Sequence, residues 1–505
     1  MEQLNWVIPT TSIFIILFLI LKRRSDHKKL PPSPPALPAI GHLHLLKQPL
    51  HRSLHKLTQK YGHVLILRFG IRKVLVVSSP SAVEECFTKN DIIFANRPRT
   101  LAGKHLGYNQ RTIGSSLYGD HWRNLRRLAT LELFSTKSLA KFQEIREDEV
   151  KLLAKQLFEE CRGQVSEVNL RLKLVELAFN TMLRVISGKR YYGKDVVVQE
   201  AKNFQILMKE FAELLGSGNI NDFFPLLQWF DFGGVEKRMV KLMSNMDSFL
   251  QNLLNEHRSV RASNRRDTEM TLIDIMLSLQ EKDREFYTDQ NIQGLILTLL
   301  VAGSETSATA MEWALSLLLN HPEAMDKARF EIDCNVGQER LVSESDISKL
   351  NYLQNVISET LRLFPVVPLM LPHESSHDCT VGGFRVPRGT MLLVNLWSMH
   401  RDSNLWEDPT RFVPERFESR RESGEGATYK LIPFGAGRRA CPGAGLAKRT
   451  MGQALGVLIQ SFEWHRIGHE KINMAEGRGA TIPKLDPLIA LCNPRQGMIE
   501  LLTHL

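Results

Sequence analysis

The residue type and setting best suited to chemistry occur at a cysteine in the glycine-rich segment FGAGRRACPG, residues 434–443. Pro442 follows Cys441 directly, and an apolar helical pattern continues from there. Because proline is favoured in the first turn of a helix, we expect Cys441 at a helix N-terminus. Free amide hydrogens and the helix dipole would stabilise a thiolate there and lower the pKa of the thiol. Such a thiolate could act as a ligand to iron. A lone cysteine elsewhere in a protein usually serves as a small, buried apolar residue.

A long apolar helix is predicted from Asp289 to Leu319, with Thr288 as a capping residue at its start. If continuous, it would be about 47 Å long and could cross a whole domain. Its middle reads VAGSETS, and a glycine inside a helix costs about 1 kcal/mol relative to alanine. We therefore expect either that another group packs closely against Gly303 or that the helix opens there.

The remaining patterns predict a mainly α protein, with one large helical domain and a minor β lobe. No repeat and no low-complexity linker follows residue 41. Further helical periodicity occurs at 139–160, 171–187, 236–259 and 443–462. Strand patterns occur at 63–79 around a turn at Gly70, at 379–385, at 390–394 and near the C-terminus.

The composition of the 505-residue chain excludes several classes of protein. Its 43% hydrophobic and 24% charged residues are near the globular average, unlike a collagen, a mucin stalk or a disordered chain. The net charge of +10 comes from dispersed basic residues without a nucleic-acid-binding signature, so no nucleic acid partner is expected. The 6 cysteines are too sparse for a disulfide scaffold and lack metal-finger spacing, which indicates a reducing compartment.

The N-terminus predicts a membrane anchor, because residues 4–21 carry no charge and would span about 27 Å, the thickness of a thin endoplasmic-reticulum bilayer. Basic residues at 22–24 follow at once, so the positive-inside rule leaves the body in the cytosol. A cleaved signal peptide is the alternative, but its basic residues would precede the apolar run. Prolines between residues 31 and 38 favour a stiff lead, although such a tract can also bind a partner. We predict a single-pass anchor at 1–21, a basic and proline-rich hinge at 22–40 and a catalytic domain at 41–505.

The segment FGAGRRACPG resembles the cysteine loop of the cytochromes P-450, the haem-thiolate monooxygenases. The resemblance covers nearly the whole chain and implies the cytochrome P-450 fold, with haem b (iron protoporphyrin IX) as cofactor. It also implies that Cys441 is the iron ligand, that Arg439 binds a haem propionate and that Phe434 packs near the thiolate.

Two more motifs resemble the family's other contacts with haem. Trp122 and Arg126 match its W-x-x-x-R, in which both side chains meet a propionate, although alone this spacing fits any amphipathic helix. His373 lies about where the family often carries a further propionate partner.

The segment AGSETS, residues 302–307, matches the family's A/G-G-x-D/E-T-T/S on the long helix above the iron. The resemblance implies that Ala302 and Gly303 lie against the cofactor, where Gly303 lets dioxygen approach. It also implies that Glu305 and Thr306 form an acid–alcohol pair, which delivers protons without flooding the site with water. The alternative for Thr306 is a hydrogen bond back to a carbonyl that kinks the helix.

A structural motif accompanies these groups. Glu359 and Arg362 match the family's E-x-x-R, and Arg416 lies in a P-E-R-F segment. The resemblance implies that the three side chains form a buried triad that fixes the cysteine loop, although E-x-x-R alone is a common ion pair. Removal of one member would strand a buried charge.

The presence of Glu305 and Thr306 favours a monooxygenase over an oxygen-independent isomerase or a haem-carrying binding protein. In membrane-anchored members of the family, electrons come from NADPH through a separate flavoprotein, NADPH-cytochrome P-450 reductase. A basic docking face would attract its acidic surface, although these side chains can also be ordinary surface charges. The candidates for this face are Arg123, Arg127, Lys137, Lys448 and Arg449.

Residues 371–402 and the cysteine loop resemble the isoflavone 2'-hydroxylase-like subgroup of plant enzymes. This resemblance implies hydroxylation of a small apolar specialised metabolite: an isoflavonoid or flavonoid-like phenolic first, and otherwise a lignan, xanthone or triterpenoid. Oxidative ring closure and phenol coupling are the alternative reactions. By family position the residues facing the cavity would be apolar, unless they only pack the core: Leu106, Ile113, Leu214, Val301, Ala302, Val366, Val367, Met370 and Ile482.

Overall fold

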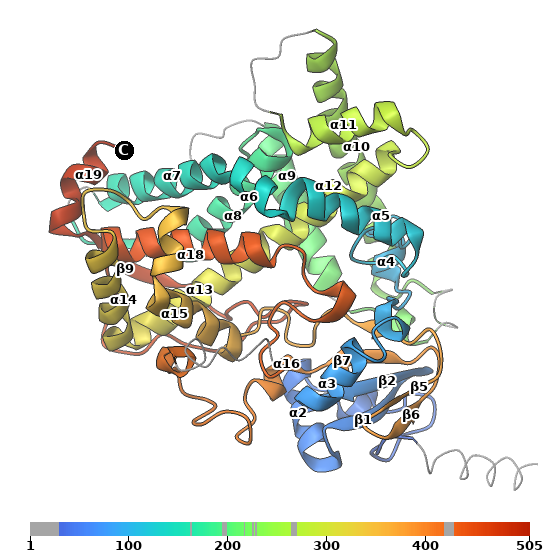
Figure 1. Cartoon of the computed structure of the whole chain (residues 1–505). Helices are drawn as coiled ribbons and strands as arrows, with labels where there is room; N and C mark the ends of the chain where they lie inside the picture. The colour runs from blue at the N-terminus through green and yellow to red at the C-terminus, as the bar shows by residue number, and fades with distance from the viewer. Residues whose placement is uncertain are drawn as a thin grey trace, which may run out of the picture.

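The computed structural model describes residues 30–161, 164–193, 199–216, 218–224, 227, 230–263, 270–418 and 429–505. The predicted anchor and the first eight residues of the predicted hinge lie outside this part of the chain. The described residues form a large helical body with a smaller β-rich lobe beside it, as Figure 1 shows. The expected mainly α fold with a minor β lobe is therefore confirmed.

The α-helices of the described residues are, in chain order, α2 Leu50–Tyr61, α3 Pro80–Phe87, α4 Leu101–His105, α5 Asp120–Ala129, α6 Thr136–Lys141, α7 Gln143–Cys161, α8 Leu170–Ser187, α9 Gln199–Gly216, α10 Val235–Ala262, α11 Leu272–Lys282, α12 Asp289–Gly303, α13 Glu305–Asn320, α14 Pro322–Asn335, α15 Asn351–Leu363, α16 Leu396–Met399, α18 Ala444–Ser461 and α19 Ile499–Thr503. The strands are β1 Val64–Phe69, β2 Arg72–Val77, β3 Ser166–Asn169, β4 His373–Glu374, β5 Cys379–Val381, β6 Phe384–Val386, β7 Met391–Val394, β8 Phe462–His465 and β9 Ile489–Pro494.

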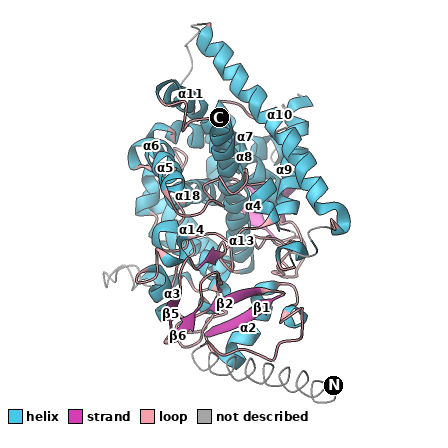
Figure 2. Cartoon of the chain, turned by 90° about the vertical axis from the view of Figure 1, so that its right-hand side faces the viewer, coloured by secondary structure: helices cyan, strands magenta, loops and turns pink. Residues whose placement is uncertain are grey.

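The β-rich lobe is built on the hairpin that the sequence predicts at 63–79. Strands β1 and β2 pair antiparallel around Gly70, whose φ of +55° suits glycine. A Cβ at Gly70 would also lie 2.3 Å from the Phe223 carbonyl oxygen, so no larger residue fits. Strand β7 joins β2 in parallel and β4 follows, which gives the order β1-β2-β7-β4. Figure 2 shows β1 and β2 side by side in this lobe. This sheet brings His373, at the start of β4, into the lobe beside the hairpin.

The long helix predicted at 289–319 is two helices, α12 and α13, separated at Ser304, where φ is −97° and ψ is −72°. A Cβ on Gly303 would lie 2.8 Å from Sδ of Met182 on α8. Both expectations for Gly303 are therefore met, because a neighbour packs against it and the helix opens directly after it. The combined segment is apolar enough to span a membrane, but 67% of its most apolar stretch is buried in the protein, as in a core helix.

Other helix boundaries differ slightly from the predictions. Helices α8 and α10 match the predicted segments closely, whereas the segment at 139–160 is divided between α6 and α7 at Phe142, which leaves helical geometry with φ −97° and ψ 16°. Periodicity persists across such a short break because apolar residues on both sides, such as Leu139 and Ile145, are buried. Helices α7, α8, α13, α15 and α18 share one apolar cluster, which forms the centre of the helical body.

Candidate functional site

The cysteine loop lies between a short 3₁₀ turn, Gly437–Arg439, and α18. The amide of Cys441 donates a hydrogen bond to the Phe434 carbonyl oxygen at 2.8 Å, which closes the loop. Gly437 has a φ of +66°, and a Cβ there would lie 2.5 Å from Oδ1 of Asp91. This glycine is therefore required both by its conformation and by the close approach of a neighbour.

The helix after the loop begins later than predicted. Helix α18 starts at Ala444 with Gly443 as its N-cap, so Pro442 lies outside the first turn. Cys441 consequently precedes the helix, although the amides of Gly443 and Ala444 still donate to its sulfur. The expectation of a helix N-terminal cysteine is thus wrong by a few residues, while the amide contacts that motivated it are present.

Cys441 has solvent-accessible surface, although protein atoms surround most of its thiol group. Burial raises its pKa, and the amides of Gly443 and Ala444 and the charge of Arg126 only partly offset this rise. The expected lowering of the pKa is therefore wrong for the protein alone, because desolvation outweighs the amide contacts. A metal ion on the sulfur would reverse this balance, since a coordinating thiol is deprotonated outright.

Guanidinium groups gather beside this loop. Arg439 donates from Nε to the Ala95 carbonyl oxygen at 2.8 Å and lies 4.3 Å from the ring centroid of Trp122. Burial, and then the charges of Arg97 and Arg126, lower the pKa of Arg439 to about 9. Burial also lowers the pKa of Arg97 to about 10. The three arginines therefore lie close enough to repel one another in a partly desolvated setting.

No ion pair joins any of these three arginines to a carboxylate within the part of the chain described above. Arg97 is buried, donates from Nη1 to the carbonyl oxygens of Leu371 and Pro372 at 2.8 Å each, and its Nε has no partner there. Positive charge buried without a counter-charge is costly, so the cluster calls for an anionic group. The two propionate carboxylates of a haem would match this demand, and the sulfur of Cys441 is the nearby atom that could act as an iron donor.

The sequence motifs did not identify Arg97 as a site residue, although it is the most buried arginine of the cluster formed with Arg126 and Arg439. Neither residue type nor spacing in the sequence distinguishes Arg97 from Arg99, which is exposed. The only local signal is its place three residues after the buried Phe94. Its burial depends on the backbone of residues 371–372, which no local pattern reveals.

His373 and Trp122 lie in the same neighbourhood but are differently engaged. The Nδ1–H of His373 donates to the Phe94 carbonyl oxygen at 2.7 Å. Burial, followed by the charge of Arg97, holds its pKa well below the usual value, so the ring is neutral and Nε2 carries a lone pair. The predicted contact of His373 with a haem propionate stays a prediction. The indole N–H of Trp122 donates to the Ile113 carbonyl oxygen at 3.1 Å.

The break between α12 and α13 brings two hydroxyls onto freed carbonyls. Thr306 Oγ1 donates to the Ala302 carbonyl oxygen at 2.7 Å, and Ser307 Oγ donates to that of Gly303 at 3.2 Å. The back-bonding alternative for Thr306 is thus present in this structure. Burial raises the pKa of Glu305, and the charge of Arg171 lowers it by less. A raised pKa makes this carboxyl group a better proton acceptor than a fully solvated glutamate, as a proton-transfer role requires.

The apolar residues predicted to face a cavity do not form one cluster. Leu106, Ile113, Leu214 and Val301 belong to or pack on one apolar cluster, and Val366, Val367 and Ile482 on another. Ile482, Leu214, Leu106 and Val366 are buried, as the core-packing alternative predicts. Met370 is the member that reaches the cysteine loop, because its Cε lies 3.1 Å from where a Cβ on Gly435 would stand.

The predicted ion-pair triad is assembled. Arg362 donates from Nε to Oε2 of Glu359 at 2.6 Å, and both residues are fully buried. Arg416 donates from Nε to the other carboxylate oxygen at 2.9 Å. Arg362 also donates from Nη1 to the carbonyl oxygens of His400 and Pro409 at 2.7 Å each. The triad therefore ties α15 to the chain that leads into the cysteine loop.

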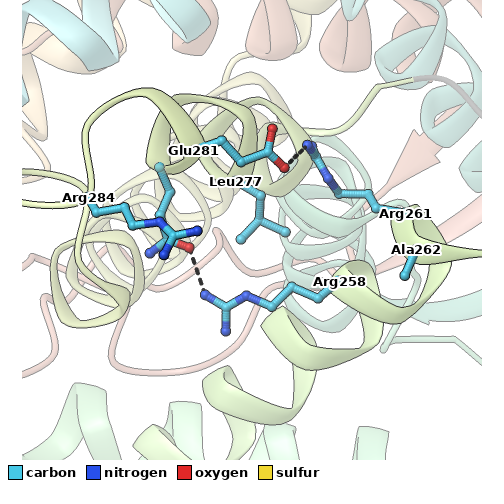
Figure 3. Close-up of a pocket in the computed structure, with 7 residues that line it drawn as sticks. Arg258, Arg261, Ala262, Leu277, Glu281 and Arg284 are labelled. Carbon is cyan, nitrogen blue, oxygen red and sulfur yellow. Dashed lines mark hydrogen bonds and ion pairs between the residues drawn. The ribbon is translucent and has the colours of Figure 1, made fainter.

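The hollow drawn in Figure 3 is a different feature, with a volume of about 570 Å³ between α10 and α11. Two of the arginines that line it already have carboxylate partners: Arg261 donates to Glu281 at 2.8 Å, and Arg258 donates to Asp289 at 2.5 Å. It contains none of the predicted site residues. We therefore place the candidate site at the cysteine loop and the α12–α13 break.

The family model described as Cytochrome P450 matches residues 31–492. The chain belongs to the cytochrome P450 family. The solved structure of a zebrafish cytochrome P450 with progesterone superposes with a TM-score of 0.75 at 26% identity, covering 89% of this chain and 100% of that one. Membership implies haem b as the cofactor, which the cysteine and the unpaired arginines fit, and electrons supplied by a reductase partner.

Curated relatives match over almost their full length. Cytochrome P450 81Q32 of Catharanthus roseus is 54% identical over 96% of this chain and 95% of its own. The (+)-piperitol/(+)-sesamin synthase CYP81Q2 of Sesamum radiatum is 49% identical over 99% and 98%. An isoflavone 2'-hydroxylase of Glycyrrhiza echinata is 47% identical over 98% of each chain. This cytochrome P450 is thus a monooxygenase of the CYP81 type that acts in plant specialised metabolism.

Proposed function

We propose that this cytochrome P450 inserts one oxygen atom into a small apolar plant metabolite, with an isoflavonoid or flavonoid-like phenolic as the leading class. The observation that carries the proposal is Cys441 in a closed loop beside Arg97, Arg126 and Arg439, which have no carboxylate partner in the described part of the chain. The isoflavone 2'-hydroxylase relative supports the substrate class. Lignans, xanthones and triterpenoids are the further candidates.

In this proposal, different residues of the chain bind the cofactor and transfer protons. Cys441 would ligate the iron, and Arg97, Arg126 and Arg439 would hold the propionates, with Trp122 stacked on Arg439. Haem bound there supplies the redox chemistry that activates O₂. Glu305 is partly buried, so it can pass a proton inward while little bulk water follows. Thr306, one residue later, offers a hydroxyl that can leave the Ala302 carbonyl and relay that proton.

The proposed function is tested by screening microsomes that contain the protein and a reductase. Flavonoids, lignans, xanthones and triterpenes are offered with NADPH, and products are identified by mass spectrometry. We expect substrate-dependent NADPH consumption and a product heavier by one oxygen atom. A thiolate-type Soret band of the reduced, CO-bound protein without substrate-dependent NADPH use across the panel would favour a haem-binding protein or an isomerase instead.

Oxidative ring closure is the second candidate reaction. At 49% identity, the sesamin synthase relative is at least as similar to this chain as the isoflavone 2'-hydroxylase relative at 47%, and that similarity favours testing this reaction. Ring closure or phenol coupling removes hydrogen from the substrate without adding oxygen to the final product. The mass change of the product in the same screen therefore distinguishes the candidates.

Thr306→Ala is expected to leave haem binding intact but to lower product formed per NADPH by about tenfold, with hydrogen peroxide released instead. Thr298→Ala is the matched control, because Thr298 Oγ1 makes the same bond to a carbonyl, that of Gly294, at 2.7 Å. If both variants keep the parental coupling, the proton-relay role is wrong. If both lose it equally, the hydroxyls act only on helix shape.

We further propose that NADPH-cytochrome P-450 reductase docks on the basic residues near the cysteine loop. Of the candidates, Arg449 pairs with the buried Glu344, and Arg123 pairs with Asp120, so their charges are partly neutralised. Arg127, Lys137 and Lys448 are exposed and have no carboxylate partner in the described part of the chain. These three residues are the strongest remaining candidates for attracting an acidic surface.

The double variant Lys137→Glu, Lys448→Glu should lower reductase-supported NADPH turnover about tenfold at low salt, with an unchanged CO-bound spectrum. Added salt should reduce the difference in NADPH turnover between the variant and the parent protein, because screening weakens long-range electrostatic attraction. Lys56→Glu, an exposed lysine on α2, makes the same kind of charge change elsewhere and should have little effect. Equal turnover in all three proteins would contradict this docking face.

We propose the endoplasmic-reticulum membrane as the location, with an anchor at 1–21, a hinge at 22–40 and a cytosolic body from residue 41. Exposed apolar side chains support a second membrane contact. Ile71 is 66% exposed at the β1–β2 turn, and its amide donates to the Phe223 carbonyl oxygen at 3.1 Å. Ile220 is likewise exposed near this contact, and Leu37 lies beside the same hairpin through its pairing with Gly41.

A further inference from the structure

The segment from Glu476 to Leu488 is a narrow loop that reaches across the helical body. Its two arms are joined by backbone bonds, from Gly477 to the Pro483 carbonyl oxygen at 2.7 Å and from Leu485 to that of Ala475 at 2.9 Å. Its tip meets the end of α9, because a Cβ on Gly216 would lie 3.1 Å from the Ala480 amide nitrogen. The position of the tip therefore depends on how the arms are held.

The returning arm is held by two neighbouring side chains of α13. Oε1 of Glu312 accepts a hydrogen bond from the Leu488 amide at 2.8 Å. The indole N–H of Trp313 donates a hydrogen bond to the Ile482 carbonyl oxygen, also at 2.8 Å. On its other side, the Ile482 amide donates to the Val366 carbonyl oxygen at 2.8 Å. These bonds end on the backbone of the loop. Helix α13 therefore positions the loop independently of the side chains that the loop carries.

Glu312 is itself fixed by an arginine of α8. Arg171 Nε lies 3.0 Å from both carboxylate oxygens of Glu312, and Arg171 Nη2 donates to the Lys484 carbonyl oxygen at 2.7 Å. Glu312 is 2% exposed, so loss of this partner would leave its buried charge balanced only by the more distant ammonium group of Lys484. Arg171 thus contacts the carboxylate and the loop at once.

This arrangement lies on the helix that carries the proposed proton donor. Glu312 follows Glu305 by seven residues, close to two helical turns, so both carboxylates project from the same side of α13. The segment 476–488 is therefore tied to the same helix that carries Glu305 and Thr306. A shift of this loop relative to α13 would change the space available to a bound molecule without moving the cysteine loop.

We propose that Glu312, Arg171 and Trp313 form a positioning clamp that sets substrate specificity by holding the loop 476–488 between α13 and α9. The clamp acts through the loop and is not part of the catalytic groups. This inference rests on the proposed function, because it takes the space beside Glu305 and Thr306, at the start of α13, as the substrate cavity.

The test compares a small and a bulky iron ligand by Soret titration of the purified holoproteins. Imidazole reports access to the iron alone, whereas clotrimazole carries aryl rings that need room around its imidazole. In Glu312→Gln and Trp313→Phe we expect the dissociation constant of clotrimazole to change about tenfold and that of imidazole to stay within about twofold. Trp313→Phe keeps the charges in place, so it remains informative if Glu312→Gln folds poorly.

Glu344→Gln is the matched control, because Glu344 is an equally buried carboxylate whose partner, Arg146, donates from Nε at 2.8 Å, away from this loop. It should bind clotrimazole as the parent does. Unchanged clotrimazole affinity in both clamp variants, or an equal change in the control, overturns the clamp. Absence of any Soret shift with imidazole in the parent would instead overturn the proposed haem function.

Discussion

Replacement of Cys441 by alanine is expected to abolish the thiolate-type Soret band of the reduced, CO-bound protein, together with all NADPH-dependent turnover. The loop around Cys441 is closed by its own backbone bond to Phe434, so the fold of the loop survives while the sulfur is lost. Without the thiolate, the arginine cluster can still attract propionates, but nothing in the loop supplies the same donor to iron. Difference spectra of the purified variant measure this loss directly.

Cys379→Ala serves as the control for the cysteine variant. Burial raises the pKa of Cys379 to about 11, and this residue lies on β5 in the small lobe. Its removal should leave the spectrum and turnover unchanged. A thiolate-type band that persists in Cys441→Ala and disappears in Cys379→Ala would show that the iron ligand is misassigned.

Arg362→Ala is expected to yield little folded holoprotein and to destabilise the remainder by about 3–5 kcal/mol. Two effects add up, because the buried carboxylate of Glu359 loses its bidentate partner and buried carbonyls lose their donor. Arg362→Lys should rescue little, since an ammonium cannot reproduce the planar fork that reaches these acceptors together. Thermal unfolding and the yield of CO-binding protein measure the effect.

The controls for the triad vary the degree of burial. Arg416→Ala should cost less than Arg362→Ala, because the Arg416 side chain is 12% exposed and water can replace part of the bond. Arg411→Ala removes an exposed pair with Asp408 on the same stretch of chain and should cost less than about 1 kcal/mol. A soluble Arg362→Ala protein with full haem loading would contradict the structural role of the triad.

Local patterns predicted most of the secondary structure correctly. The hairpin around Gly70 and helices α8 and α10 follow from short-range periodicity and from a turn that only glycine tolerates. The boundaries that were missed, at Phe142 and before Ala444, lie where apolar periodicity continues across a change of backbone direction. A pattern of side-chain types does not report φ and ψ at such positions.

The sequence by itself determined the family of this protein and its candidate site residues, because Cys441, Glu305, Thr306 and the E-x-x-R pair stand in short motifs whose spacing is read along the chain. Only the tertiary structure decided which charges are buried and which are neutralised. Arg97 joins the cluster through the backbone at 371–372. Burial, followed by the charge of Arg97, holds the pKa of His373 well below its usual value. The clamp on the loop 476–488 likewise joins α8, α13 and the C-terminal strands. Burial and pairing depend on segments far apart in sequence, so no local pattern contains them.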